Sequence, residues 1–256
     1  MIRLLFIILC CLNIAATNWN DNVNCMGSWA MTSGSTETDL SGEGGTLTES
    51  ASDDIPTGTS CPDIYSACSS RDFELGDTED LSHADGLSTD ISGANQAISF
   101  VAWIKPESLS ISNHEVISKY VTTDNQRQYN FFVASDGSVT CQLSPDGTSS
   151  TGVAVTATGV ITTGAWYHIG CVYNDTDIRV YVNGVLSSNG ASNPKAYTSG
   201  IFDSTALFHV GARISSSGQF DGLITDVGVF NDALTAAEVF EIYSHGMNGV
   251  EPRRMF

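Results

Sequence analysis

Apolar and polar residues alternate along most of the chain between residues 97 and 230. The alternating runs are short and are separated by turn residues, which is the pattern of half-buried β-strands. Many short strands at this spacing predict an all-β sandwich. The predicted strands cover residues 97–106, 114–120, 128–135, 138–144, 152–158, 166–174, 177–184, 206–213 and 222–230.

Three pairs of Asp or Asn with Gly mark turns between these strands. They are Asp136-Gly137, Asp146-Gly147 and Asn183-Gly184. Asn183-Gly184 is the strongest hairpin signal, because both positions tolerate the positive φ that a type I′ turn requires.

A single helical pattern follows the last strand, at residues 235–245. Thr235 and Glu238 have the spacing of a capping box, and Gly246 is expected to end the helix in a left-handed conformation. A helix this short is unstable alone, so we expect it to pack on a sheet. Its acidic residues are expected to cap it and to face solvent rather than to do chemistry. The expected packed face contains Ala236, Val239, Phe240 and Tyr243.

The first residues have the layout of a secretory signal peptide. One basic residue, Arg3, precedes an apolar run from Leu4 to Leu12 and the small pair Ala15-Ala16. We expect cleavage after residue 16 and a secreted, extracellular mature protein; an uncleaved anchor is the alternative.

The rest of the chain predicts one domain, residues 22–247, followed by a tail at 248–256. Residues 32–70 are rich in Ser, Thr, Gly and Asp, which is typical of loops or an irregular sheet edge. No Pro-rich linker or internal repeat divides the strand region.

The chain is strongly acidic. Ten Lys and Arg oppose 29 Asp and Glu, which gives a formal charge of −19. Such a surface repels phosphate backbones and anionic lipid headgroups, so neither nucleic acid nor, after signal cleavage, a membrane is an expected partner. The acidity suits divalent cations or a saline habitat, or it only keeps an exported protein soluble.

Seven cysteines are present, and Cys10 and Cys11 fall in the signal segment. The remaining five are an odd number, so at least one is unpaired. Cys61 and Cys68 are spaced to close a short loop, whereas Cys141 and Cys171 lie in strand-like runs as buried neighbours, either bonded or simply apolar. No CxxC pair supports a zinc site. The fifth is Cys25.

Four segments resemble the laminin G-like branch of the concanavalin A-like lectin/glucanase superfamily. They are CMGSWAM with TDLSGEGGTLT (25–48), FELGDTEDL leading to ISFVAWIKPE (73–107), TGAWYHIGCVYNDTDIRVYVNG (163–184) and DGLITDVGVFNDALTAAEV (221–239). The resemblance implies a two-sheet antiparallel jelly roll with one short C-terminal helix, in which a curved face or a loop-bearing rim binds ligands. The same fold carries enzymes, lectins and adhesion modules, so fold alone does not give function.

Catalysis is not expected. The β-glucanases of this superfamily carry an E-x-D-x-E or E-x-D-x-x-E strand, and the nearest match here is ETDLSGE, Glu37 to Glu43. Its last acid comes too late, and Ser41-Gly42 makes the segment resemble a turn. No GxSxG, HExxH or phosphate-binding motif is present, and the histidines are scattered, with His168 inside a strand-like run and expected to pack.

The resemblance also implies a calcium site. Laminin G-like modules take one side chain from an I-F-[ND]-S stretch and an Asp from a loop after an earlier hairpin strand. Here IFDSTALFHVGA places Asp203 at the first position and QLSPDG offers Asp146 at the second, with the carbonyl of Ile201 as a further ligand. The alternative is that both aspartates are ordinary turn residues.

Three further residues are expected to contact a ligand. Asp124-Asn125 in TTDNQRQYNFF resembles the start of a pentraxin calcium site, although the later acidic cluster is replaced by GARISSSG; a turn is the alternative. Tyr120 is expected at a rim where it can stack on a sugar. Tyr129 and Tyr197 are also expected to reach a rim, whereas Trp103 and Trp166 are expected in the core.

Together these features predict an exported, non-catalytic carbohydrate-binding or adhesion module, with calcium as its cofactor and a glycan, cell-surface polysaccharide or protein as its partner. A structural component of a cell surface, filament or virion is the alternative. A glycoside hydrolase of the same fold is the third hypothesis.

Overall fold

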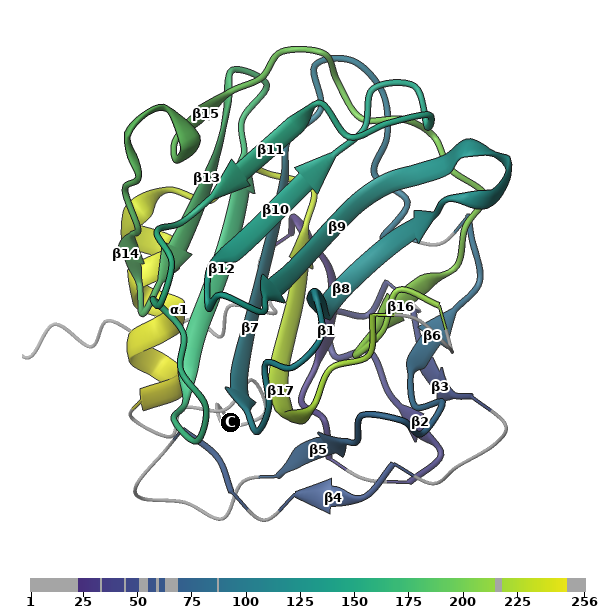
Figure 1. Cartoon of the computed structure of the whole chain (residues 1–256). Coiled ribbons are helices and arrows are strands. Elements are labelled where there is room, and N and C mark those ends of the chain that lie inside the picture. The colour runs from purple at the N-terminus through teal and green to yellow at the C-terminus, as the bar shows by residue number, and fades with distance from the viewer. Residues whose placement is uncertain are drawn as a thin grey trace, which may run out of the picture.

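The computed structural model of the chain describes residues 23–32, 34–43, 45–50, 55–58, 60–62, 69–86, 88–214 and 218–247. These residues form two antiparallel sheets packed face to face, with one helix on the outer face of one sheet (Figure 1). The predicted signal peptide, the predicted tail and Cys68 lie outside the described residues.

The first sheet has the strand order β14-β13-β12-β7-β17-β5-β4, with β1 paired to β17 and β15 paired to β13. Its strands are β1 (Cys25–Trp29), β4 (Thr57–Gly58), β5 (Ser70–Phe73), β7 (Ile98–Pro106), β12 (Tyr167–Tyr173), β13 (Asp177–Val182), β14 (Val185–Leu186), β15 (Lys195–Ala196) and β17 (Gly222–Phe230).

The second sheet has the order β11-β10-β9-β8-β16-β6-β3-β2. Its strands are β2 (Thr36–Glu37), β3 (Leu47–Glu49), β6 (Leu81–His83), β8 (Asn113–Val121), β9 (Gln126–Ala134), β10 (Val139–Leu143), β11 (Gly152–Val155) and β16 (Phe208–Val210). The chain crosses between the sheets before β2, β4, β6, β7, β8, β12, β16 and β17, which makes the sandwich a jelly roll and confirms the predicted fold class.

Each predicted strand corresponds to an observed strand, β7 to β13, β16 or β17. Hydrophobic alternation identified them because every second side chain faces the core between the sheets, as Tyr129, Phe131 and Val133 of β9 do. The Asn183-Gly184 hairpin is also confirmed, with φ of 50° and 75° at the two positions.

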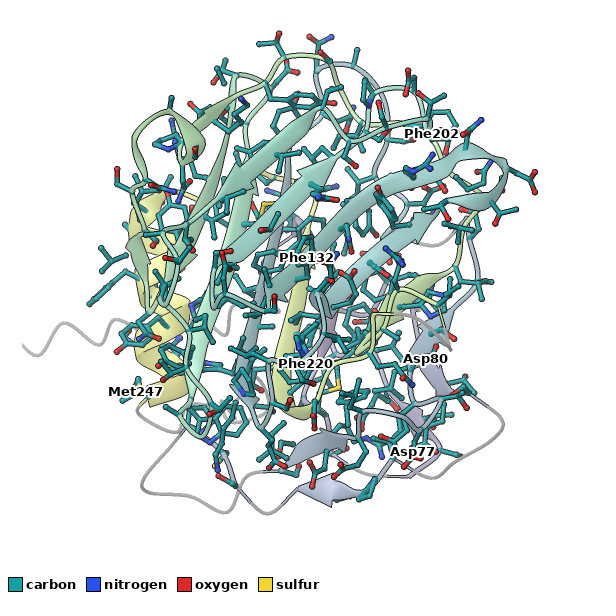
Figure 2. All side chains as sticks on the ribbon, viewed as in Figure 1. Asp77, Asp80, Phe132, Phe202, Phe220 and Met247 are labelled. Carbon is teal, nitrogen blue, oxygen red and sulfur yellow. A yellow bond between two sulfur atoms is a disulfide. The ribbon has the colours of Figure 1, made fainter. Side chains whose placement is uncertain are left out.

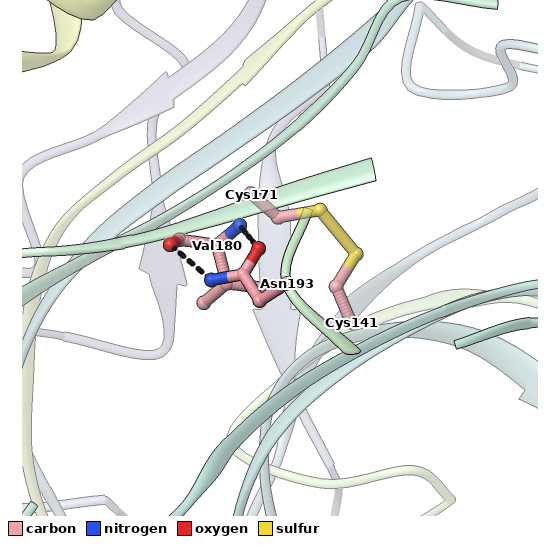
Figure 3. The surroundings of a disulfide bond; sticks show 4 residues. All are labelled: Cys141, Cys171, Val180 and Asn193. Atoms are coloured by element: carbon pink, nitrogen blue, oxygen red, sulfur yellow. Dashed lines mark hydrogen bonds between the residues drawn. A yellow bond between two sulfur atoms is a disulfide. The ribbon is translucent and has the colours of Figure 1, made fainter. Parts of the chain in front are cut away.

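A disulfide joins the two sheets through the core. Cys141 of β10 is bonded to Cys171 of β12, so these cysteines are bonded neighbours and not merely apolar ones (Figure 3). Beside it, the Asn193 side chain accepts a hydrogen bond from Val180 N (2.9 Å) and donates one to Val180 O (2.8 Å). Cys25 is buried and free, and Cys61 is disulfide-bonded.

Helix α1 (Ala236–Met247) packs on the outer face of the first sheet through Val239 and Ile242. The capping box is confirmed: Thr235 N donates to Glu238 Oε2 (2.7 Å) and Glu238 N donates to Thr235 Oγ1 (3.3 Å). Three expectations were wrong. The helix continues through Gly246, Ala236 is exposed, and Phe240 is half exposed rather than packed.

No helix among the described residues is long and apolar enough to span a bilayer.

Candidate functional site

The residues predicted to bind a ligand or metal lie at one end of the sandwich. They belong to the end of β8 with the β8–β9 loop (119–125), the β10–β11 loop (144–151) and segment 198–207, which precedes β16. We call these three segments the rim. Phe202 marks the rim beside the β8–β9 hairpin (Figure 2).

Gly147 is the point where the three rim segments meet. A Cβ built on Gly147 would lie 2.1 Å from Asn125 O and 2.7 Å from the Phe202 ring. Phe202 N donates to Ser144 O (2.8 Å), and Arg127 Nη1 donates to Gly147 O (2.9 Å). The rim is therefore closely packed, and the structure brings Asn125 and the loops of Asp146 and Asp203 together.

The two predicted metal ligands differ in their surroundings. Asp146 is exposed, and its Oδ1 accepts hydrogen bonds from Thr148 N (2.9 Å) and Thr148 Oγ1 (2.8 Å), which lower the pKa of its carboxyl. These two hydrogen bonds form an Asx turn, which is the alternative to a metal ligand that the sequence suggested for Asp146. Asp203 is exposed, and its carboxylate makes no hydrogen bond or ion pair with any described residue.

The third predicted ligand, Ile201, is buried at the base of the rim. Its carbonyl oxygen accepts a hydrogen bond from Gly93 N (2.7 Å), and its N–H donates to Gly93 O (3.0 Å). One lone pair of this carbonyl is therefore already used, and only the second remains for a cation.

Asp124 and Asn125 form the tip of the β8–β9 hairpin. Both have left-handed backbone, with φ of 56° and 57°, and both side chains are exposed. Consecutive left-handed residues other than glycine are uncommon, and Asp and Asn tolerate this conformation best. The left-handed turn therefore accounts for Asp and Asn at these positions as well as a ligand-binding role would.

Of the three tyrosines expected at the rim, only Tyr120 lies there. Tyr120 is half-buried, and the Arg127 guanidinium lies 5.9 Å from its ring centroid, so one face of the ring is covered. Tyr129 and Tyr197 are buried, and their hydroxyls donate to Thr89 O (2.9 Å) and Gly200 O (2.7 Å). For those two the expectation was wrong, because a hydroxyl satisfied by a carbonyl allows a tyrosine to fill the core.

Lys119 is a rim residue that the sequence analysis did not identify. Its side chain is 1% exposed, and its Nζ pairs with Asp85 Oδ1 (2.7 Å) and Asp90 Oδ1 (3.3 Å) and donates to Ser204 O. The signal was a lysine within the strand-like run HEVISKY. This ammonium links β8 to the segment that carries Asp203.

Two of the three acids of ETDLSGE serve the architecture. Glu37 is buried and forms an ion pair with Arg71 Nε (2.7 Å). Asp39 Oδ1 accepts hydrogen bonds from Ser28 N (2.9 Å) and Ser41 N (3.0 Å). These two carboxylates are therefore occupied with structural partners.

One group of three acids with metal-ligand spacing occurs among the described residues, at the end of the sandwich opposite the rim. The carboxylate oxygens of Asp72, Glu74 and Glu107 lie within 4.8 Å of one another. Burial raises the pKa of Asp72 and of Glu74, and neighbouring carboxylates add to both shifts.

Comparisons with known proteins agree with this fold. A laminin G-type family model, described as "Concanavalin A-like lectin/glucanases superfamily", matches residues 79–240. Usherin of Homo sapiens is 24% identical over 149 residues, which are 58% of this chain and only 3% of usherin.

Two solved structures are similar at low identity. The binding domain of botulinum neurotoxin serotype G has a TM-score of 0.65 and 13% identity, over 86% of this chain and 51% of that chain. Domain 4 of AbnA, an extracellular arabinanase from Geobacillus stearothermophilus, was solved with arabinotriose; it has a TM-score of 0.58 and 19% identity, over 86% of this chain and 98% of that chain.

Likeness at this level of identity shows the fold alone. The family model, however, covers more than half of the chain and includes most strands of both sheets. The chain therefore belongs to the laminin G branch of the concanavalin A-like lectin/glucanases superfamily.

Proposed function

We propose that the protein is an exported, non-catalytic carbohydrate-binding or adhesion module that binds its ligand at the rim with the help of calcium. The observation that carries the proposal is the convergence of Asn125, Gly147 and Phe202, which holds three loops together. A loop platform fixed in advance by such contacts loses little entropy when a ligand binds.

The donor set of the rim suits calcium. Hard divalent cations prefer carboxylate and carbonyl oxygens, and the rim offers Asp203, the free oxygen of Asp146 and the remaining lone pair of Ile201 O. With two carboxylates the affinity expected is that of extracellular calcium modules, a Kd of about 10⁻⁴ to 10⁻³ M. Calcium bound there would supply open coordination positions for sugar hydroxyls.

The absence of catalysis is part of the proposal. Glycoside hydrolysis needs two carboxyl groups on opposite sides of a scissile bond, one of them available as an acid. Of the acids in the glucanase-like segment, Glu37 is held by Arg71 and Asp39 by backbone amides. The signal-peptide pattern of residues 1–16 and the acidic surface support export.

A glycan array probed in calcium and again in chelator tests the function. Binding in calcium that is lost in chelator is the expected result. Absence of binding in both conditions would contradict the proposal and favour the structural or assembly role. Release of reducing sugar from a polysaccharide would favour the hydrolase.

Calcium titration by calorimetry tests the metal site. Asp203→Ala and Asp146→Ala are each expected to weaken calcium binding at least about tenfold, because each removes one charged ligand. Asp136→Ala is the matched control, since Asp136 precedes a glycine and its Oδ1 accepts from Ser138 N (3.0 Å) and Oγ (2.7 Å) in the same way as Asp146. Equal affinity in all four proteins would refute the rim as the calcium site.

A further inference from the structure

A cleft of about 450 Å³ opens at the end of the sandwich opposite the rim. It is lined by Leu75, Ile111, Ser112, Asn113, Arg213, Gly218 and Gln219. Strand β8 separates the two regions: Asn113 begins it and Val121 ends it at the rim. Nine residues of strand span roughly 26 to 30 Å, so the cleft is distinct from the rim.

Both walls of the cleft are fixed to the start of β8. On one side Ile111 N donates to His114 Nε2 (3.3 Å), and Ser112 O accepts from Ser135 N (3.3 Å). On the other side Gly218 O accepts from Glu115 N (3.0 Å), and Phe220 N donates to Gly211 O (2.7 Å). The cleft is therefore held open by the fold, as a preformed site is.

A buried polar group without a partner lies in the wall. Gln219 is 9% exposed, and its Nε2 makes no hydrogen bond with any described residue. Leaving a buried amide donor unpaired destabilises the folded state. A native chain tolerates that cost where a ligand or an ordered water completes the hydrogen bond.

Glu115 organises the polar groups behind this wall. Its Oε1 accepts hydrogen bonds from Asn130 Nδ2 (3.2 Å) and Asn113 Nδ2 (3.4 Å), so Asn113 turns its Oδ1 away from Glu115. A Cβ on Gly218 would lie 2.6 Å from Glu115 Cγ, so only glycine allows the wall to close over the carboxyl. Burial raises the pKa of Glu115 to about 7.

We propose that this cleft is a second ligand site, which binds one unit of a neutral, hydroxyl-rich ligand such as a sugar. Gln219 Nε2 and Arg213 supply donors, Asn113 Oδ1 supplies an acceptor, and Leu75 and Ile111 supply an apolar wall. A sugar presents the matching chemistry, because its hydroxyls both donate and accept and its C–H faces are apolar.

The charges near the cleft disfavour an anion. The chain carries a formal charge of −19, and Asp72, Glu74 and Glu107 gather at the same end of the sandwich. The one cation in the lining, Arg213, is already drawn to Glu115 by electrostatic attraction. A neutral ligand therefore fits better than an acidic one.

Nuclear magnetic resonance titration of the ¹⁵N-labelled protein with arabinotriose, xylotriose, maltotriose or cellotriose, each at millimolar concentration, tests the proposal. At least one trisaccharide is expected to shift the side-chain amide signals of Asn113 and Gln219 and the backbone signal of Gly218. The same shifts are expected in chelator and in the Asp203→Ala variant, because the cleft contains no rim residue. Sialyllactose serves as the anionic probe.

Gln219→Met is the decisive variant. Methionine keeps the volume and removes the donor. Since Nε2 has no partner among the described residues, the free variant is expected to fold and to be at least as stable as the wild type. Trisaccharide affinity is expected to fall at least about tenfold. Gln96→Met, at a half-buried glutamine away from the cleft lining, is expected to bind as the wild type does.

Three results would overturn the second site. They are no shift at the cleft with any neutral trisaccharide, unchanged affinity in Gln219→Met, and binding of sialyllactose alone. Binding that disappears in chelator with shifts confined to the rim would also refute the cleft, but it would leave the proposed function intact.

Discussion

Gly246 in the last turn of α1 lies against the indole of Trp103 on β7. A Cβ built on Gly246 would be 2.2 Å from Trp103 Nε1 and 2.7 Å from its Cε2. Trp103 is buried, stacks on Tyr243 with ring centroids 5.6 Å apart and meets His168 edge-on at 5.4 Å. The indole is held by these rings, so the close approach of helix to sheet requires glycine at 246.

Gly246→Ala is therefore expected to destabilise the protein, although alanine favours a helix by about 1 kcal/mol over glycine. The overpacked methyl group is expected to cost about 1 to 3 kcal/mol more than this gain. Unfolding in urea measures the difference. Glu241→Ala, at an exposed position of the same helix, is the control and is expected to change stability by less than about 0.5 kcal/mol. A more stable Gly246→Ala protein would contradict the overpacking, because it would show that the indole moves aside for the methyl group and that helix propensity decides the outcome.

The Cys141–Cys171 disulfide closes a segment with a sequence separation of 30. The loss of chain entropy for such a loop predicts a stabilisation of about 3 to 4 kcal/mol. The double variant Cys141→Ala/Cys171→Ala is expected to lose at least this amount in guanidinium unfolding. Cys25→Ala, at the buried free cysteine, is expected to lose about 1 kcal/mol for its smaller side chain alone. Equal losses in the two proteins would contradict a stabilising role for the bond.

The main strands were predictable because each has one face on the core, so its polarity alternates over five or more residues, as in β9 and β17. Strands β2, β3 and β4 were not, since two or three residues are too short to show a period. The helix was predicted from its capping box. Its packed face was predicted only in part, because the sheet beneath it decides that Ile242 and not Phe240 is covered.

The rim was predictable from sequence to the extent that turn residues identify loops. Tertiary contacts decide the rest. Arg127 covers Tyr120, and Lys119 meets Asp85, 34 residues away in sequence. The cleft was not predicted at all, because the residues near Gln219 and those near Asn113 meet only when β16 pairs with β8.

His168 makes stability sensitive to acid. It is fully buried under α1, and burial lowers its pKa from 6.5 to about 3. The unfolded chain takes up a proton near pH 6.5 and the folded chain does not, so stability falls as pH drops from about 6.5 toward 3. The difference of about 3.5 pH units corresponds to about 5 kcal/mol. His168→Phe is expected to make the free energy of unfolding less dependent on pH between pH 6.5 and 4. If the variant lost as much stability as the wild type over this range, the acid sensitivity would not come from His168.

Glu115 has the opposite pH dependence. Burial raises its pKa from 4.5 to about 7, despite the opposing effects of the Asn130 and Asn113 amides and Arg213. The folded state holds the proton more tightly, so its stability falls as pH rises from 4.5 to 7, by about 3 kcal/mol in total. Glu115→Gln is expected to match the wild type near pH 4.5 and to exceed it in stability at pH 8. Denaturant unfolding at the two pH values measures this difference. If Glu115→Gln were less stable than the wild type by the same amount at both pH values, the carboxyl would not titrate in this range.

Lys119 is expected to hold the rim in place without a metal. Its buried ammonium is shared by Asp85, Asp90 and Ser204 O, so Lys119→Met leaves two carboxylates facing each other with no cation between them. Removing one partner of a buried ion pair costs about 3 kcal/mol. We expect a loss of this size in urea unfolding, with faster hydrogen exchange at Ala206, whose N–H donates to Ser204 Oγ (3.0 Å).

Two further variants separate the charge effect from the loss of the lysine side chain. Lys119→Met combined with Asp85→Asn and Asp90→Asn is expected to recover part of the stability, because the unpaired carboxylates are removed. Lys195→Met, at a half-buried lysine of β15 that pairs with no described acid, is expected to change stability by less than about 0.5 kcal/mol. If the triple variant were no more stable than Lys119→Met, the rim would depend on packing of the aliphatic part of Lys119 and not on its charge. Recovered stability in the triple variant would instead show that the Lys119 ammonium orders the segment that carries Asp203.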